Sequence, residues 1–285
     1  MEYIFLIIVV ICVSLQNILK KHYATKTEKQ NTFLFAFFTV FAAMLFFVVQ
    51  SGFKLEFNPA ILPYCVGFAV SFCATMFGAF LAIKYGPLSI TLLLTSYSLI
   101  IPTFHGVFVL NDSISLVGII GFALLLISLF FINIKKGEET EKKFSLKWFI
   151  YLLMSFFGNG FCSLIQKLQQ LKFDGDYKSE FMILALLMCC VFFIGATVIC
   201  KEKIKVGLKY CLPLGIFGGV ANGVVNYLVM VLSNILPSAI LYPSISAGGI
   251  VIGFVVALFV YKEKLTKTQF LGYLIGTVSV ALLNL

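Results

Sequence analysis

The sequence predicts an all-helical integral membrane protein whose ten transmembrane helices form two inverted five-helix repeats. Three observations lead to this prediction. Hydrophobic residues make up 61% of the 285 residues and charged residues 12%, whereas charged residues make up about 25% of a soluble globular domain. The hydrophobic residues fall in runs close to the roughly 20 residues that a membrane-spanning helix needs, and a helix satisfies its own backbone groups in lipid. The two halves of the chain also resemble each other.

Apolar runs that end at charged or turn-forming residues define the ten expected spans. They cover residues 2–20, 31–50, 60–84, 87–109, 114–134, 147–170, 180–200, 209–232, 237–260 and 267–285. The first run lacks the basic start and the small-residue cleavage pattern of a signal peptide, so we expect it to be retained as a span.

A charged stretch in the middle of the chain, residues 135–146, separates the expected first repeat (1–134) from the second (147–285). Similar segments recur at an offset of about 150 residues, as in "AIKYGPLSITLL" at 82–93 and "LSNILPSAILY" at 232–242. The alignment pairs Pro87 with Pro237, Asp112 with Glu263, and Gly121 with Gly272. Because each repeat has an odd number of spans, the second copy is expected to enter the membrane from the opposite side. Inverted repeats of this kind place a substrate site near the bilayer midplane.

The end of the chain, "YKEKLTKTQFLGYLIGTVSVALL" at 261–283, carries a family pattern of acid, base, Leu, Thr and two spaced glycines. With the ten spans and the segment "YGPLSITLL", it resembles the EamA-type transporters of the drug/metabolite transporter (DMT) superfamily. The matching residues are Glu263, Lys264, Leu265, Thr266, Gly272 and Gly276. The first repeat departs from the pattern, since "NDSIS" at 111–115 lacks the basic residue. The resemblance implies that the helices surround a central cavity, lined mainly by spans 1, 3, 4, 6, 8 and 9. It also implies that the protein moves small metabolites or drugs.

Side-chain amides interrupt several apolar spans, and they are the first candidate substrate-binding residues: Gln16, Asn17, Asn159, Gln166, Asn222 and Asn226. Asn222 and Asn226 share one helix face because they are four residues apart. The four-helix multidrug relatives carry a glutamate in the first span, where this chain has Gln16 and Asn17. A neutral amide can bind a solute but cannot exchange a proton for a cation. The alternative is that these amides only bond neighbouring helices.

Proline residues predict interruptions in the fourth and ninth spans. Pro102 removes a backbone hydrogen bond in "TSYSLIIPTFHG" at 95–106, and "YPSISAGG" at 242–249 is expected to break in a comparable way. Interrupted helices at corresponding places in two repeats indicate a transport site. The residues expected to line it are Tyr97, Ser98, Tyr242, Ser244 and Ser246, with packing as the alternative.

Few other side chains within the spans have reactive chemistry. His105 titrates near neutral pH and is a candidate for proton or pH sensing, or else a hydrogen-bonded residue at a helix end. Lys167 is expected to extend to the membrane interface, with substrate contact as the alternative. The eight cysteines include no CxxC pair, so neither a metal nor a cofactor is expected. The Gly219–Gly223, Gly249–Gly253 and Gly272–Gly276 steps predict close helix packing.

The net charge of +9 comes from 21 lysines and no arginine, mostly at span ends, which excludes a nucleic-acid role. Sixteen lysines follow spans 1, 5, 7 and 9. The positive-inside rule would place that side in the cytoplasm and both termini outside. The family resemblance implies cytoplasmic termini, and the two indications disagree.

These features predict a secondary transporter or exporter of a small neutral or zwitterionic metabolite, such as an amino acid, by alternating access. The alternatives are a broad-specificity drug exporter and, less favoured, a channel or a non-transporting membrane protein. An enzyme is not expected, because the spans lack a convergent set of His, Asp, Glu or Cys. The expected partners are a small-molecule substrate and membrane lipids, and the chain is expected to be a monomer or homodimer. Its expected location is the plasma membrane, and more specifically a bacterial inner membrane.

Overall fold

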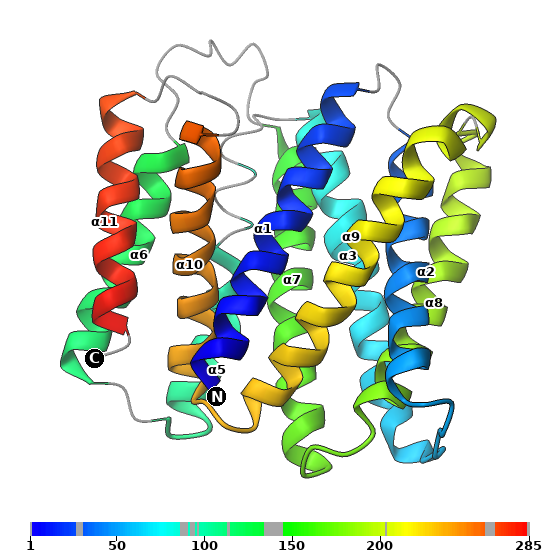
Figure 1. Ribbon diagram of the computed structural model, residues 1–285, viewed down its shortest axis with the longest axis horizontal. Helices are drawn as coiled ribbons and strands as arrows, with labels where there is room; N and C mark the ends of the chain where they lie inside the picture. Colours follow the sequence, from blue (N-terminus) through cyan, green and yellow to red (C-terminus); the bar gives the residue numbers. More distant parts are fainter. Residues whose placement is uncertain are drawn as a thin grey trace. The chain divides into compact units, whose positions relative to one another are not determined.

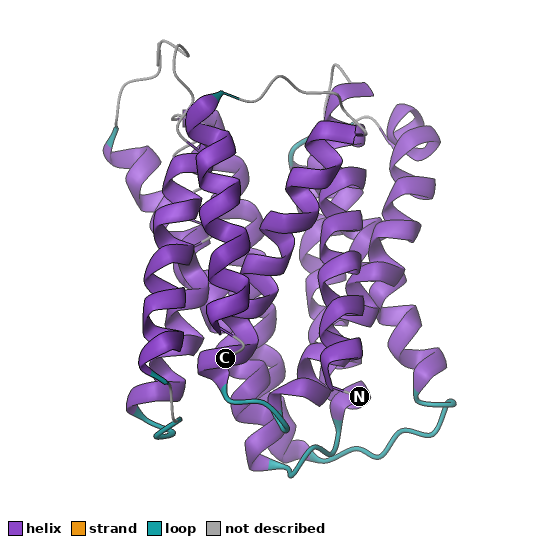
Figure 2. Cartoon of the chain, turned by 60° about the vertical axis from the view of Figure 1, so that its left-hand side comes forward, coloured by secondary structure: helices purple, strands orange, loops and turns teal. Residues whose placement is uncertain are grey.

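All regular elements in the described part of this computed structural model are helices (Figure 2). The structure describes residues 2–26, 31–85, 91, 95, 97–112, 115–133, 145–202, 204–259 and 266–283. The helices are α1 (Glu2–Lys26), α2 (Thr32–Gln50), η1 (Pro59–Ile61), α3 (Leu62–Tyr85), η2 (Tyr97–Leu99), α5 (Ile100–Phe108), α6 (Leu116–Asn133), α7 (Leu146–Lys172), α8 (Lys178–Ile199), α9 (Ile204–Ser233), α10 (Ser238–Phe259) and α11 (Lys267–Leu283), where η marks 3-10 turns. The predicted all-helical class is therefore confirmed.

Among the described residues, five helices are long and apolar enough to cross a membrane. They are Thr32–Gln50, Pro59–Ala82, Leu146–Lys172, Lys178–Ile199 and Cys211–Ser233. Three shorter apolar helices cover Glu2–Gln16, Tyr97–Phe108 and Leu116–Ile132. The chain is thus compatible with a multi-pass membrane protein, while ten crossings in inverted repeats stay a prediction.

Helix ends differ from the predicted spans where charged residues continue a helix. α1 runs to Lys26 and α9 begins at Ile204, so both extend past the predicted bounds at 20 and 209. Charged side chains are tolerated at the ends of a spanning helix because they can reach the interface. Bounds set at the first lysine therefore shorten the helix.

The predicted break in the ninth span is wrong, because α10 continues as an α-helix through residues 242–249 with Pro243 inside it. One proline removes one backbone hydrogen bond, and neighbouring groups in a membrane protein can compensate for that loss. In the fourth predicted span, the described part is the 3-10 turn η2 followed directly by α5, which contains Pro102.

The helices group into two compact units. Unit 1 comprises residues 1–73 and 165–234, and unit 2 comprises residues 74–164 and 235–285. Each unit draws on both halves of the chain, so a unit is not the same as a predicted repeat. Residues 135–144 of the predicted linker lie outside the described residues.

In unit 1, α9 packs against both α1 and α2, and α8 packs against α2 (Figure 1). Gly219 faces the backbone of Thr39, and a Cβ at Gly223 would lie 2.6 Å from the Phe46 ring. The predicted close packing at this glycine step is therefore confirmed.

A carboxylate holds the first turn of α2 in unit 1. The backbone N–H groups of Phe33 and Leu34 donate to the two carboxylate oxygens of Glu202, at 3.0 and 2.9 Å. Glu202 lies between α8 and α9, so the hydrogen bonds connect that turn to α2. A carboxylate is favourable there because the first N–H groups of a helix lack partners within the helix.

In unit 2, α11 packs against α6, and α10 contacts α5, α6 and α11 (Figure 1). A Cβ at Gly272 would lie 2.8 Å from the backbone nitrogen of Ile132, and the Ser128 hydroxyl donates to the Gly272 carbonyl at 2.7 Å. Buried Leu125, Leu129 and Ala247 form the core between these helices.

The chain contains one tryptophan, Trp148, and it is buried in unit 2. Its indole N–H donates to the Thr91 hydroxyl at 2.9 Å. The ring packs with Ala82, Leu152 and Tyr151.

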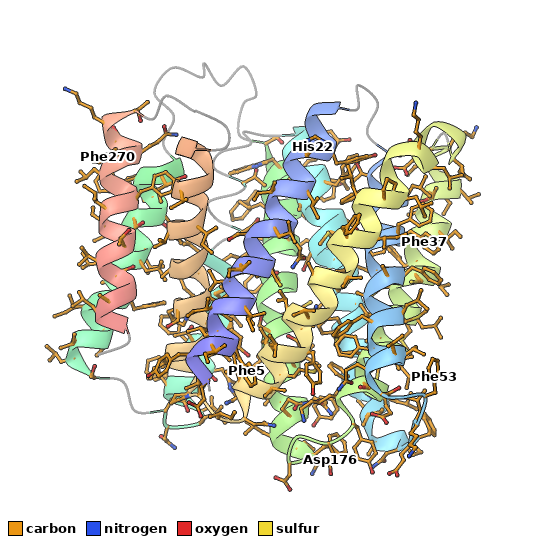
Figure 3. All side chains as sticks on the ribbon, in the orientation of Figure 1. Phe5, His22, Phe37, Phe53, Asp176 and Phe270 are labelled. Atoms are coloured by element: carbon orange, nitrogen blue, oxygen red, sulfur yellow. The ribbon has the colours of Figure 1, made fainter. Side chains whose placement is uncertain are left out.

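Large apolar side chains cover much of the outer surface. Phe53 and Phe270, labelled in Figure 3, have exposed fractions of 76% and 48%. Many exposed apolar side chains are costly in water and favourable in lipid, which agrees with a membrane-embedded chain.

Candidate functional site

Four predicted amide residues form one hydrogen-bonded chain in unit 1, here called the central amide chain: Gln16 of α1, Asn222 and Asn226 of α9, and Gln166 of α7. Gln166 Nε2 donates to Asn226 Oδ1 at 2.8 Å. Asn226 Nδ2 donates to Asn222 Oδ1 at 2.9 Å, and Asn222 Nδ2 donates to Gln16 Oε1 at 3.0 Å. Three helices that are distant in sequence thus share one polar connection.

The central amide chain runs head to tail, since each amide group donates to the oxygen of the next. It ends where Gln16 Nε2 donates to the Cys12 carbonyl at 3.4 Å. Hydrogen bonds arranged in this order polarise one another in a low-dielectric interior. None of the four side chains is ionisable, so the chain offers hydrogen bonds without a fixed charge.

Asn222 lies at the middle of the apolar segment Cys211–Ser233. Gln16 and Gln166 are buried, whereas Asn222 and Asn226 are half-buried. A half-buried amide at the middle of a spanning helix is costly against lipid, so its accessible atoms are best matched by water or a polar solute. The arrangement can therefore bind a neutral polar group.

A second chain of amides lies at the ends of α7 and α9, and sequence reasoning did not single it out. Asn234 Nδ2 donates to Gln170 Oε1 at 3.3 Å, Gln170 Nε2 donates to Gln169 Oε1, and Gln169 Nε2 donates to the Asp176 carbonyl at 3.0 Å. Gln169 and Gln170 are fully buried. The signal was present as the run "QKLQQLK" at the end of an apolar span, because buried amides need partners.

A glycine in the turn after α7 makes room for this second chain. Gly175 has φ +86°, a left-handed conformation that suits glycine. A Cβ there would lie 2.7 Å from Asn234 Nδ2. The turn and the end of α9 are thereby held together.

Lys167, which the sequence predicts to extend to the membrane interface, is buried against the end of α9. Its side chain is 6% exposed, and its Nζ donates to the carbonyl of Ser233, the last residue of α9. A cation is favourable beside the unpaired carbonyls of a helix C-terminus. The lysine therefore joins α7 to α9 inside unit 1.

The candidate residues of unit 2 form separate hydrogen bonds. Asn159 Nδ2 of α7 donates to the hydroxyl of Ser98 in η2 at 2.6 Å, and Ser98 is fully buried. A Cβ at Gly160 would lie 2.7 Å from the Ser98 carbonyl, so α7 and η2 approach closely here.

The two tyrosines predicted to line the site donate their hydroxyls to backbone carbonyls. Tyr97 donates to Leu126 of α6 at 2.7 Å, and Tyr242 donates to Ser163 of α7 at 3.0 Å. Tyr242 is buried, and Tyr97 packs against the core of Leu125 and its neighbours. In this conformation both hydroxyls already bind helix backbone.

Three buried polar atoms in unit 2 have no hydrogen-bond partner among the described residues: His105 Nδ1, Ser238 Oγ and Ser244 Oγ. His105 lies in the last turn of α5, and its Nδ1 lacks the hydrogen bond that the alternative of a hydrogen-bonded helix-end residue would give it. Ser246 is half-buried on the same helix as Ser244. The side chain of Asn17 lies outside the described part, as do Pro87 and Glu263.

Within the described ranges, no three His, Cys, Asp or Glu side chains come together to hold a metal ion. The site chemistry that can be described is therefore that of amides, hydroxyls and one histidine. In unit 1 these groups are the amides of the central amide chain, and in unit 2 they are hydroxyls and His105.

Comparison with known proteins supports the fold only. No family model and no curated protein matches the chain. Twenty-nine chains of solved structures match it. One of them, described only as "Crystal structure of protein", superimposes with a TM-score of 0.76 at 11% sequence identity, covering 99% of this chain and 95% of the other. At this identity the likeness extends to the helical fold and not to activity.

Proposed function

We propose that the protein is a secondary transporter of a small neutral or zwitterionic metabolite, working by alternating access in the plasma membrane. The central amide chain is the observation that supports this proposal most. It brings four uncharged carboxamides together among apolar helices, and two of them are half-buried. A solute with hydrogen-bonding groups but no net charge suits such a surface, because no ionised partner is needed.

The proposal includes ten crossings in two inverted repeats, as in the DMT superfamily. The offset similarity between the halves and the closing sequence motif support it. Helices also coincide with nine of the ten predicted spans over their described residues. The remaining one, the fourth predicted span at 87–109, is helical at 97–108.

The test begins with purified protein in detergent and a library of amino acids, amines, sugars and sugar phosphates. Its readout is the shift of the thermal unfolding midpoint that each compound causes. A compound that stabilises the protein is then loaded into proteoliposomes, and counterflow of the labelled compound is measured with and without a pH gradient. We expect saturable counterflow of an uncharged or zwitterionic compound. This counterflow should not require a pH gradient.

The matched variants are Asn222→Leu in the central amide chain and Asn58→Ala outside the spans. The Asn58 side chain accepts the backbone N–H of Ala60 at 3.0 Å. Asn222→Leu should remove the stabilising effect of the compound and its counterflow, while Asn58→Ala should keep both. Equal counterflow in the two variants, or preference for an anion, would contradict the proposal.

A further inference from the structure

Unit 2 contains a polar cluster of its own, and none of its residues belongs to the central amide chain. The cluster surrounds the first turn of α10 and consists of Asp112, His105, Gly106, Ser238 and Tyr242. Asp112 follows α5 in the chain, and its carboxylate oxygen Oδ2 accepts the backbone N–H of Ser238 at 2.6 Å. Its own backbone N–H donates to the Gly106 carbonyl at 2.9 Å. The carboxylate therefore ties the end of α5 to the start of α10.

The cluster has no spare room at Gly106. A Cβ there would lie 2.5 Å from the Ser238 Cβ and would also overlap the Asp112 carboxylate. α5 and α10 thus meet at the glycine next to His105. A change in the histidine or in Asp112 acts directly on this contact.

His105 is in the last turn of α5, where its Nδ1 is buried and has no partner among the described residues. The Ser238 hydroxyl beside Asp112 is likewise buried and unpartnered. Asp112 interacts electrostatically with His105 and also with Tyr242 of α10. Tyr242 already donates its hydroxyl to Ser163. Histidine is the residue type in this cluster whose ordinary pKa lies near neutral pH.

We propose that His105 and Asp112 form a proton-binding site that controls the N-terminus of α10. A neutral imidazole suits the observed arrangement, since a positive charge beside the buried, unpaired Nδ1 would be costly. The Asp112 carboxylate interacts electrostatically with His105, but it is bound to the backbone of Ser238. A proton on His105 therefore favours a second arrangement in which Asp112 leaves α10 and pairs with the imidazolium. The hydrogen bond from Ser238 to Asp112 is therefore stable at pH values where His105 is neutral. It weakens as the pH falls and His105 becomes protonated.

This inference does not depend on what the protein transports, and it concerns a different unit from the central amide chain. The test is hydrogen–deuterium exchange of the purified protein between pH 5.5 and 7.5, with rates corrected for the intrinsic effect of pH. Ordinary carboxylates stay ionised over this range, because their pKa values lie near 4, whereas histidine titrates near 6.5. The peptide that contains Ser238 and the following turn is the reporter.

The wild-type protein should lose protection in this peptide roughly fivefold to tenfold on acidification, as expected for a local opening equilibrium that one proton shifts. The first turn of α2, which Glu202 caps, is the internal control and should change little. The chain has two histidines, so His22→Gln provides a matched variant that should retain the wild-type response. His22 lies near the far end of α1 in unit 1 (Figure 3).

His105→Gln should abolish the pH response of the Ser238 peptide. Asp112→Asn provides a second test if His105→Gln does not fold, and it should give protection that does not depend on pH. The proposal is overturned if the wild type shows no response, if either His105→Gln or Asp112→Asn keeps it, or if His22→Gln removes it.

Discussion

Units 1 and 2 differ in how their polar side chains are paired. In unit 1, amides bond to other amides, and one chain connects α1, α7 and α9. In unit 2, Tyr97 and Tyr242 bond to backbone carbonyls, and three buried polar atoms lack partners in the described residues. Side chain to side chain bonds fix the helices that carry them, whereas unpartnered atoms leave capacity for a proton or a solute. The comparison predicts a more rigid unit 1 and a more responsive unit 2.

The largest expected effect comes from cutting the central amide chain. Asn226→Leu removes an acceptor for Gln166 and a donor to Asn222, so we expect a loss of about 3 kcal/mol in the free energy of unfolding. Asn159→Leu in unit 2 removes one hydrogen bond, to Ser98, and should cost about 1 kcal/mol. Unfolding titrations of the purified variants measure both. Equal losses would remove the distinction between the units.

Added methyl groups provide the next comparison. Gly219→Ala in unit 1 pushes against backbone of α2 that cannot easily shift, and should cost about 2 kcal/mol. Gly106→Ala in unit 2 meets side chains of Asp112 and Ser238 and should cost about 1 kcal/mol. Gly195→Ala is the control, because nothing lies within 4 Å of its added Cβ. It should leave stability unchanged or raise it by up to about 1 kcal/mol through helix propensity.

Substitutions of the two carboxylates that bind helix N-termini, Glu202 and Asp112, should differ less in their cost to stability than the preceding pairs. Glu202 accepts two backbone N–H groups, and Glu202→Gln keeps one acceptor oxygen, so its cost should be about 1 to 2 kcal/mol. Asp112→Asn can still accept the single N–H of Ser238 and should cost about 0.5 to 1 kcal/mol at pH 7.5. Thermal unfolding at fixed pH measures the stability loss of each variant. A larger loss in Asp112→Asn than in Glu202→Gln would show that the number of hydrogen bonds to the carboxylate does not determine the loss.

Removing an unpartnered hydroxyl should have the smallest effect. Ser244→Ala deletes a buried oxygen that has no partner in the described residues, so stability should stay the same or rise by about 0.5 kcal/mol. Ser128→Ala is the matched variant, since it loses a bond to the Gly272 carbonyl and should cost about 1 kcal/mol. A clear loss of stability in Ser244→Ala would mean that the hydroxyl has a structural partner.

The all-helical class followed from sequence because long apolar runs leave few other ways to satisfy the backbone in lipid. Helix ends were less accurate, since lysines such as Lys26 continue a helix beyond the apolar run. Pro243 misled the prediction of a break, because the effect of one proline depends on the packing around α10.

The candidate site was predictable in part. An amide in an apolar span indicates a buried partner, and Gln16, Gln166, Asn222 and Asn226 do partner one another. The choice of partner depends on contacts between helices as far apart in sequence as α1 and α9, and a local pattern does not contain that information. The roles of Glu202 and Asp112 were missed for the same reason. Each lies in a connection that appeared to be only a charged turn.

Because the chain has one tryptophan and it is buried in unit 2, the tryptophan fluorescence of this protein reports on that unit. The indole of Trp148 is hydrogen-bonded to Thr91, and solvent reaching it should shift its emission to longer wavelengths. A measurement on unlabelled protein can therefore follow changes in the part of the molecule that we expect to respond, without an introduced dye.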